Sequence, residues 1–242
     1  MPRLYCAVPL ASGVTLDLPA AAARHVQVLR MQPGEAVTLF NGQGGEYTAV
    51  IDRMGRSDVG VTVGDHAPVE REATRAVHLV VGMPANERMD WLVEKAAELG
   101  AASIQPVLAQ RSVLKLQGER AQKKQAHWQS IAVAACEQSG RNRVPPVRQI
   151  VALAQWAAAP DTPNFQRKAR LMLSFGPEAQ PLRNAADGDG EVLLLSGPEG
   201  GLTPQEEALA ITLGFQRVTL GARVLRSETA PLAALAALTL AR

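Results

Sequence analysis

The sequence is poor in the residues that would commit it to several classes of protein. It has two cysteines and four histidines, with no CxxC spacing and no Cys/His cluster, so neither a disulfide framework nor a zinc site is predicted. No segment approaches the ~20 consecutive apolar residues of a membrane-spanning helix. The apolar run at the N-terminus is too short for a secretory signal. We therefore expect two reduced thiols, no metal, no membrane segment and a cytoplasmic protein.

What is present fits a globular protein with one large or two modest domains. The 242 residues are 47% hydrophobic and 20% charged, which provides for a sizeable core. The net charge is only +2, but residues 110–148 hold eight Lys or Arg against two acids. Such a local positive charge suits a polyanion, and it also suits a solvated helix face. Charge alone leaves both interpretations open.

The first 72 residues predict a small β-barrel domain. Short alternating or β-branched segments separated by turns indicate strands at 3–8, 36–41, 46–52 and 58–65. A short helix followed by a strand is expected at 20–31. Closing these strands into a barrel would remove exposed edges. The charged run 67–75 contains Pro68 and is the best linker, so we place the domains at 1–72 and 73–242.

Residues 73–242 predict an α/β domain with a largely parallel sheet, because strands alternate with helices. The expected strands are 76–83, 103–109, 170–175, 191–197 and 217–221, and the expected helices are 87–100, 119–139 and about 231–240. The last helix is apolar all round. It is therefore expected to be buried, either in the core or in a subunit interface.

Two glycine-containing loops follow the last two strands, at 196–201 and 220–230. Strand ends followed by loops are where open α/β sheets bind ligands, and glycine lets backbone amides approach a ligand closely. Thr203, Pro204 and Glu206 predict a capped helix directly after the first loop. The loop GPEGG fits neither GxGxxG nor GxxxxGK[ST], so the usual nucleotide signatures are absent.

Four segments together resemble one known family. They are EKAAELG (94–100), CEQSGRNRVP (136–145), GPEGG (197–201) and LG followed by VLRSET (220–229). In this order, over nearly the whole chain, they resemble the bacterial ribosomal RNA small subunit methyltransferase E family, within the SPOUT class of trefoil-knotted methyltransferases. His25 with Val28-Leu29-Arg30 also resembles the family's pattern.

The resemblance implies a fold, a reaction and partners. The expected fold is α/β, with a PUA-like β-barrel that holds RNA followed by a knotted domain that binds S-adenosyl-L-methionine. Members methylate N3 of one uridine in the 16S ribosomal RNA of the small ribosomal subunit. A homodimer is expected, with each cofactor site close to the subunit interface.

It also implies roles for individual residues. The cofactor-binding residues would be Leu173, Ser174, Ser196, Gly197, Pro198, Glu199, Gly200, Gly201, Leu220, Gly221, Val224, Leu225 and Arg226. The RNA-binding residues would be Arg3, His25, Arg30, Arg88, Arg141 and Arg143.

Methylation of a uracil imide needs removal of its proton and stabilisation of the resulting anion. Arg226 is the leading cation for the second task, because a guanidinium stays charged and can face two oxygens; its alternative role is to bond loop carbonyls. Glu199 and Glu228 are the protein groups that would accept the proton, and water is a third acceptor. These alternatives stay open at the level of sequence.

Two competing functions remain. One is a SPOUT methyltransferase with another RNA target, such as a 2′-hydroxyl of transfer RNA. The other is a non-catalytic RNA-binding or ribosome-assembly protein. The intact GPEGG and VLRSETA loops argue against a decayed cofactor site.

Overall fold

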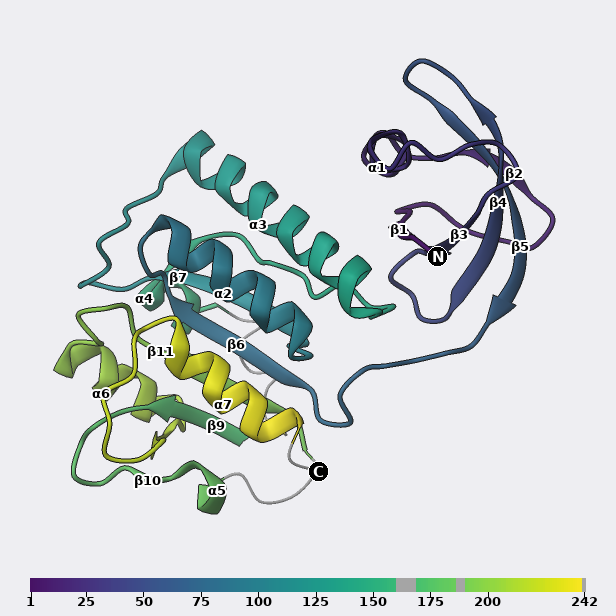
Figure 1. Ribbon diagram of the computed structural model, residues 1–242. Helices are drawn as coiled ribbons and strands as arrows, with labels where there is room; N and C mark the ends of the chain where they lie inside the picture. The colour runs from purple at the N-terminus through teal and green to yellow at the C-terminus, as the bar shows by residue number, and fades with distance from the viewer. Residues whose placement is uncertain (160–168, 186–189, 241–242) are drawn as a thin grey trace. The chain divides into compact units, whose positions relative to one another are not determined.

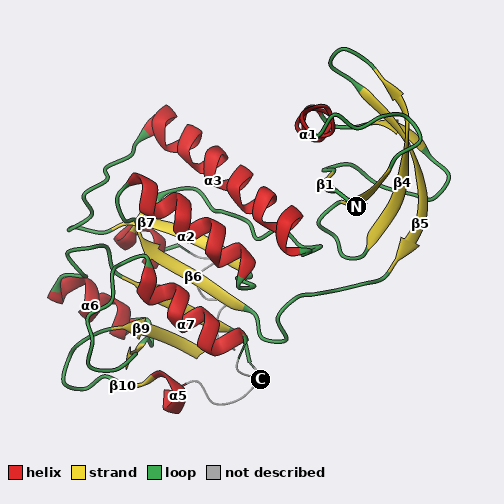
Figure 2. Cartoon of the chain, in the orientation of Figure 1, coloured by secondary structure: helices red, strands yellow, loops and turns green. Residues whose placement is uncertain are grey.

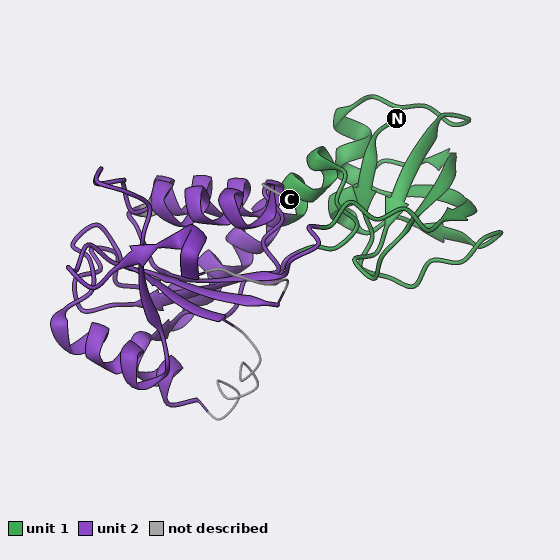
Figure 3. Cartoon of the chain, turned by 90° about the horizontal axis from the view of Figure 1, so that it is seen from below, with its two compact units in different colours: residues 1–72, 133–144 green, residues 73–132, 145–242 purple. Residues whose placement is uncertain are grey.

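The chain divides into two compact units in the computed structural model, which describes residues 1–159, 169–185 and 190–240. Unit 1 comprises Met1–Glu72 together with Val133–Val144, and unit 2 comprises Ala73–Ala132 and Pro145–Arg242. Figure 3 colours the two units. The sequence alone does not assign Val133–Val144 to the N-terminal unit.

Unit 1 contains a five-stranded sheet, the helix α1 (Ala20–Val28) and the C-terminal end of a longer helix, α3 (Gly118–Ser139). The sheet order is β1-β3-β4-β5-β2, with β1 parallel to β3 and the other neighbours antiparallel. The strands are β1 (Arg3–Tyr5), β2 (Thr15–Asp17), β3 (Ala36–Phe40), β4 (Glu46–Met54) and β5 (Val59–Ala67). Alternating apolar residues predicted four of them, because Leu39, Ile51 and Val61 point into the core. The three-residue β2 was missed.

The prediction of a strand directly after α1 is wrong. The helix ends at Val28, and Arg30 takes a left-handed backbone conformation with φ of 56°. The amide of Met31 then bonds back to the carbonyl of Val26 at 3.3 Å. The alternation of Val26 and Val28 misled the prediction, since Val26 is buried on the helix while Val28 is 71% exposed.

Polar contacts attach segment 133–144 to the rest of unit 1. The backbone amide of Tyr5 donates to Oε1 of Glu137 at 2.9 Å, and Arg71 donates to the carbonyl of Gly140 at 3.0 Å. Asn142 donates to the carbonyl of Val69 at 2.5 Å. The charged run after β5, which includes Val69 and Arg71, is therefore hydrogen-bonded to segment 133–144.

Glu46, at the start of β4, gives unit 1 a measurable acid sensitivity. It accepts hydrogen bonds from Arg71 at 2.9 Å and from Arg3 at 2.5 Å. The bond from Arg71, reinforced by Arg3, lowers the pKa of Glu46 from 4.5 to about 2. Because the folded-state pKa is the lower one, this carboxylate stabilises the fold above pH 4.5 and loses its effect as the pH falls through about 2.

We expect Glu46→Gln to lower the free energy of unfolding by about 3 kcal/mol at pH 6, and by roughly half as much at pH 3. Urea unfolding of both proteins at each pH measures the difference. A difference that does not shrink on acidification would contradict the assignment of Glu46 as an ionised, paired group.

Unit 2 is a seven-stranded sheet in which every neighbouring pair is parallel, in the order β10-β12-β9-β11-β6-β7-β8. Its strands are β6 (Val77–Gly82), β7 (Ser103–Leu108), β8 (Val151–Ala152), β9 (Ala169–Leu173), β10 (Gln180–Pro181), β11 (Val192–Ser196) and β12 (Gln216–Thr219). This confirms the predicted α/β domain and its parallel sheet. The two-residue strands β8 and β10 are too short to show a pattern.

Helices lie on both faces of this sheet (Figures 1 and 2). They are α2 (Asn86–Glu98), α3 (Gly118–Ser139), α4 (Leu153–Ala157), α5 (Leu182–Ala185), α6 (Pro204–Thr212) and α7 (Thr229–Thr239), of which α3 runs on into unit 1. The apolar helix α7 packs beside α2 on β6 and β11, and Leu232, Leu235 and Leu238 are buried there. No helix among the described residues is long and apolar enough to cross a membrane.

Candidate functional site

A cavity of about 450 Å³ lies in unit 2, where β9, β11 and β12 end. These strands are neighbours in the sheet, in the order β12-β9-β11, so their carboxyl ends meet at one edge. Ligands of open α/β sheets bind at such an edge. The lining residues are Leu173, Ser174, Phe175, Gly176, Ser196, Gly197, Pro198, Glu199, Gly200, Gly201, Leu202, Glu207, Val218, Thr219, Leu220, Arg223, Val224, Leu225, Ser227 and Ala230.

Most residues that the resemblance assigned to a cofactor lie in this lining. Gly221 and Arg226 belong to the loop between β12 and α7 but are not among the lining residues. The structure adds residues adjacent to the predicted ones, namely Phe175, Gly176, Leu202, Glu207, Val218, Thr219, Arg223, Ser227 and Ala230. Several of them continue the same strand ends, which is the signal that could have identified them.

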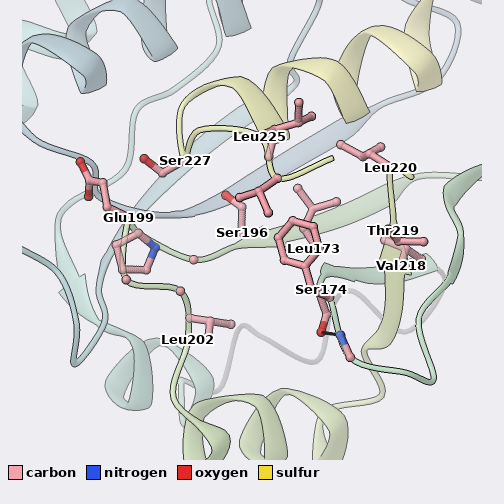
Figure 4. Close-up of a pocket in the computed structure, with 18 of the residues that line it drawn as sticks. Leu173, Ser174, Ser196, Glu199, Leu202, Val218, Thr219, Leu220, Leu225 and Ser227 are labelled. Atoms are coloured by element: carbon pink, nitrogen blue, oxygen red, sulfur yellow. Dashed lines mark hydrogen bonds between the residues drawn. The ribbon is translucent and has the colours of Figure 1, made fainter. Parts of the chain in front are cut away.

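The two ends of the cavity differ in character. In Figure 4, Glu199 and Ser227 lie at one end, whereas Leu220, Val218 and Thr219 line the other. Leu173 and Leu225 lie between them. A ligand with one apolar ring and one charged part matches this division, because apolar walls bury the ring while a few polar groups fix its orientation.

The loop from Gly197 to Leu202 is held by a hydrogen bond within its own backbone and by contacts with Arg111 and Gly82. The amide of Gly201 bonds to the carbonyl of Pro198 at 2.8 Å, and Arg111 donates to the carbonyl of Gly200 at 2.9 Å. Gly82 at the end of β6 lies directly beneath, where a Cβ atom would come within 2.5 Å of Cδ of Pro198. No sequence pattern predicted that residues 82 and 111 support this loop.

Helix α6 fixes the far end of the same loop through the predicted capping box, which the structure confirms. The amide of Glu206 donates to Oγ1 of Thr203 at 3.3 Å, and the Glu206 carboxylate accepts from the amide of Thr203 at 2.9 Å. The other carboxylate oxygen accepts from the amide of Gln110 at 2.7 Å. A rigid loop loses little conformational entropy when a ligand binds.

Ser196 provides a direct indication that the cavity takes a polar ligand. Its residue is 3% exposed, and among the described residues its Oγ has no hydrogen-bond partner. An unsatisfied buried hydroxyl costs about 1–3 kcal/mol, so a ligand that supplies a partner gains this energy.

Three charged residues gather at the Glu199 side of the cavity. Glu199 accepts from the amide of Ala85 at 2.9 Å and from Nη1 of Arg88 at 3.4 Å. Nε of Arg88 also lies 3.7 Å from Oε1 of Glu228. Arg88, predicted as an RNA contact, is thus the cation that joins both predicted proton acceptors. Arg226 is exposed in the loop before α7.

The other predicted RNA contacts lie in unit 1, and four of the five lie beside carboxylates. Arg3 pairs with Glu46, Nδ1 of His25 lies 3.3 Å from Glu137, and the buried Arg141 pairs with Glu72. Two are exposed. Arg143 lies 3.6 Å from Glu70, with its side chain 58% exposed. The remaining contact, Arg30, has no hydrogen-bond or ion-pair partner for its side chain among the described residues.

Neither cysteine takes part in this site. Both are free and buried, and burial raises the pKa of Cys6 to about 12 and that of Cys136 to about 11. No group of three or more His, Cys, Asp or Glu that could hold a metal ion occurs in the part of the chain that the structure describes.

Comparison with known proteins places the chain in a family. Residues 71–239 match the model of the RNA methyltransferase domain, and residues 18–63 match that of the RNA methyltransferase PUA domain. Ribosomal RNA small subunit methyltransferase E of Synechocystis sp. is 33% identical over 97% of this chain and 76% of its own length. The chain belongs to the ribosomal RNA small subunit methyltransferase E family.

Other members of the methyltransferase E family support the same conclusion. The Bacillus subtilis protein is 31% identical over 93% of this chain and 90% of its own. The crystal structure of the Neisseria gonorrhoeae protein, bound to S-adenosyl methionine, is 40% identical and superposes with a TM-score of 0.91 over 98% of this chain and 96% of that one. The resemblance in the four sequence motifs is therefore confirmed.

Proposed function

We propose that this chain uses S-adenosyl-L-methionine to methylate N3 of one uridine in the 16S RNA of the small ribosomal subunit, in the cytoplasm. The observation that carries the proposal is the cavity at the ends of β9, β11 and β12, which combines a polar end, apolar walls and an unsatisfied buried hydroxyl. Family membership supports the reaction class, and the related Neisseria gonorrhoeae protein binds S-adenosyl methionine.

The cavity fits this cofactor in size and chemistry. Apolar walls for an adenine ring are provided by Leu173, Leu220 and Leu225. Backbone groups of the loops before α6 and α7 would form hydrogen bonds with the edge of the ring. The hydroxyl of Ser196 would find its partner on a polar group of the ligand. When bound, the cofactor supplies an electrophilic methyl group on a sulfonium sulfur.

The chain itself has two chemical tasks, which are to remove the imide proton of uracil and to stabilise the charge left on the ring. A carboxylate at the polar end of the cavity, Glu199, suits the first. Positioned acid–base groups of this kind typically contribute a factor of about 10²–10⁴ in rate. The proposed cation role of Arg226 is tested by Arg226→Ala, which on this proposal slows methylation while leaving cofactor affinity unchanged.

For RNA, we propose that the exposed Arg30 and Arg143 contact phosphates. The left-handed φ of 56° at Arg30 supports this, since a non-glycine residue in that conformation costs about 1–2 kcal/mol and persists where the rest of the structure enforces it. Arg3, His25 and Arg141, which face carboxylates, would instead hold unit 1 together.

We also propose that the protein is a homodimer with a trefoil knot in unit 2, as in the SPOUT class. Val224 lines the cavity and is nevertheless 81% exposed. A second copy covering the loop before α7 would bury this side chain. Sedimentation equilibrium tests the dimer, and a monomer at micromolar concentration would exclude it.

The reaction is tested with small ribosomal subunits that lack the modification. We expect label from methyl-labelled S-adenosylmethionine to enter the RNA, and nucleoside mass spectrometry to identify 3-methyluridine. A 2′-O-methylated nucleoside would indicate another target. Absence of any methylation, together with absence of cofactor binding by calorimetry, would favour a binding protein without turnover.

A further inference from the structure

The identity of the proton acceptor can be addressed from the surroundings of the two candidate carboxylates. Glu199 lines the cavity, and its side chain is 25% exposed. Glu228 is not among the lining residues, and its side chain is 11% exposed. A general base must come within hydrogen-bond reach of the proton that it removes, which favours the carboxylate that lines the cavity.

The partners of the individual carboxylate oxygens also distinguish Glu199 from Glu228. Glu228 has both oxygens engaged, since Oε1 lies 3.7 Å from Nε of Arg88 and Oε2 accepts from the hydroxyl of Ser227 at 3.2 Å. Glu199 uses Oε1 alone, for the amide of Ala85 and for Arg88. Among the residues that the structure describes, Oε2 of Glu199 has no hydrogen-bond or ion-pair partner.

Arg88 connects the two carboxylates and holds one oxygen of each. The planar donors of its guanidinium fix the direction of an approaching carboxylate. The residue lies in the first turn of α2, so it ties that helix both to the loop after β11 and to the residue preceding α7. Glu228 is buried, and its Oε1 lies near Nε of Arg88, whereas Oε1 of Glu199 accepts from Nη1.

We propose that Glu199 is the catalytic base, acting through Oε2, and that Arg88 is the residue that positions it, with Glu228 as the anchor of Arg88. The inference rests on the proposed reaction at uridine N3. In the step, the N3–H bond breaks and its electron pair stays on N3, while the proton forms an O–H bond with Oε2. After the product leaves, this proton passes to water and the carboxylate is restored.

The test is the single-turnover rate of 3-methyluridine formation on small ribosomal subunits from pH 5 to 9, with cofactor affinity measured by calorimetry for each variant. We expect Glu199→Gln to lose about 10²–10⁴ in rate at neutral pH with S-adenosylmethionine at saturation, where cofactor affinity does not limit the rate. Its residual rate should rise about tenfold per pH unit, because solvent hydroxide then removes the proton.

Variants of Arg88 and Glu228 distinguish residues that position Glu199 from the residue that accepts the proton. Arg88→Gln should lower the single-turnover rate, because Oε1 of Glu199 loses the guanidinium that holds it in place. Arg88→Lys retains a charge and should restore part of the rate. Glu228→Gln should lower the rate far less than Glu199→Gln does and keep the wild-type pH profile.

Wild-type rate and pH profile in Glu199→Gln would overturn the inference, and so would a loss in Glu228→Gln as large as that in Glu199→Gln. If Glu199→Gln proves unfolded by thermal melting, the rates of Arg88→Gln and Arg88→Lys decide instead, and a wild-type rate in Arg88→Gln overturns the inference. Wild-type protein that forms no 3-methyluridine refutes the proposed function itself. Formation of that product by wild type and Glu199→Gln alike refutes only the role of Glu199.

Discussion

Gly82→Ala is expected to reduce the methylation rate about 100-fold, although Gly82 is not among the residues that line the cavity. The added Cβ atom would lie 2.5 Å from Cδ and 2.6 Å from the backbone nitrogen of Pro198, and 3.0 Å from the carbonyl carbon of Gly197. Two of these atoms belong to the backbone, so the loop after β11 must shift. A displacement of about 1 Å near reacting groups can cost 10² in rate.

Gly60→Ala is a matched control for this substitution. Gly60 lies within β5 of unit 1, and its nearest neighbour would be 3.6 Å from the new Cβ atom, which is an ordinary contact. Single-turnover rates and thermal melting of both variants make the comparison. Equal rates for Gly82→Ala and wild type would show that the loop does not depend on its contact with β6.

Arg141→Ala is expected to lower the free energy of unfolding by about 3 kcal/mol, because it leaves a carboxylate unpaired in a largely buried site. The Arg141 side chain is 5% exposed, and its Nε lies 3.1 Å and 3.2 Å from the two carboxylate oxygens of Glu72, whose side chain is 21% exposed. Urea denaturation measures the change.

Arg143→Ala serves as the control, two residues along the same segment. Arg143 is exposed and 3.6 Å from Glu70, and such surface pairs contribute less than about 1 kcal/mol. If Arg141→Ala instead keeps wild-type stability and only weakens RNA binding in a salt-dependent way, the residue is an RNA contact and not part of the unit 1 framework.

Part of the fold and part of the cavity lining could be predicted from the sequence. The strands of the parallel sheet were predictable because β6 and β11 are continuous apolar runs, and the capping box before α6 is local in sequence. The cavity lining was largely predictable from its motifs. Gly82 and Arg111 were missed because their contacts with the loop after β11 join residues far apart in the chain.

The segment CEQSGRNR (136–143) also has contacts that could not be predicted from the sequence. Arg141 and Arg143 were predicted to contact RNA, and neither the motif nor the net charge of this region says anything about their partners within the fold. In the structure, Glu72 and Glu70 face Arg141 and Arg143, across about 70 positions of sequence. Charge counts over a window cannot detect acids that come from elsewhere in the fold.

We propose above that the cavity at the ends of β9, β11 and β12 holds S-adenosylmethionine. Amide hydrogen–deuterium exchange with and without the cofactor tests it most directly. We expect slowed exchange at residues 173–176, 196–202 and 220–230, with β3, β4 and β5 of unit 1 unchanged. Protection confined to other residues, or none at saturating cofactor, would contradict it.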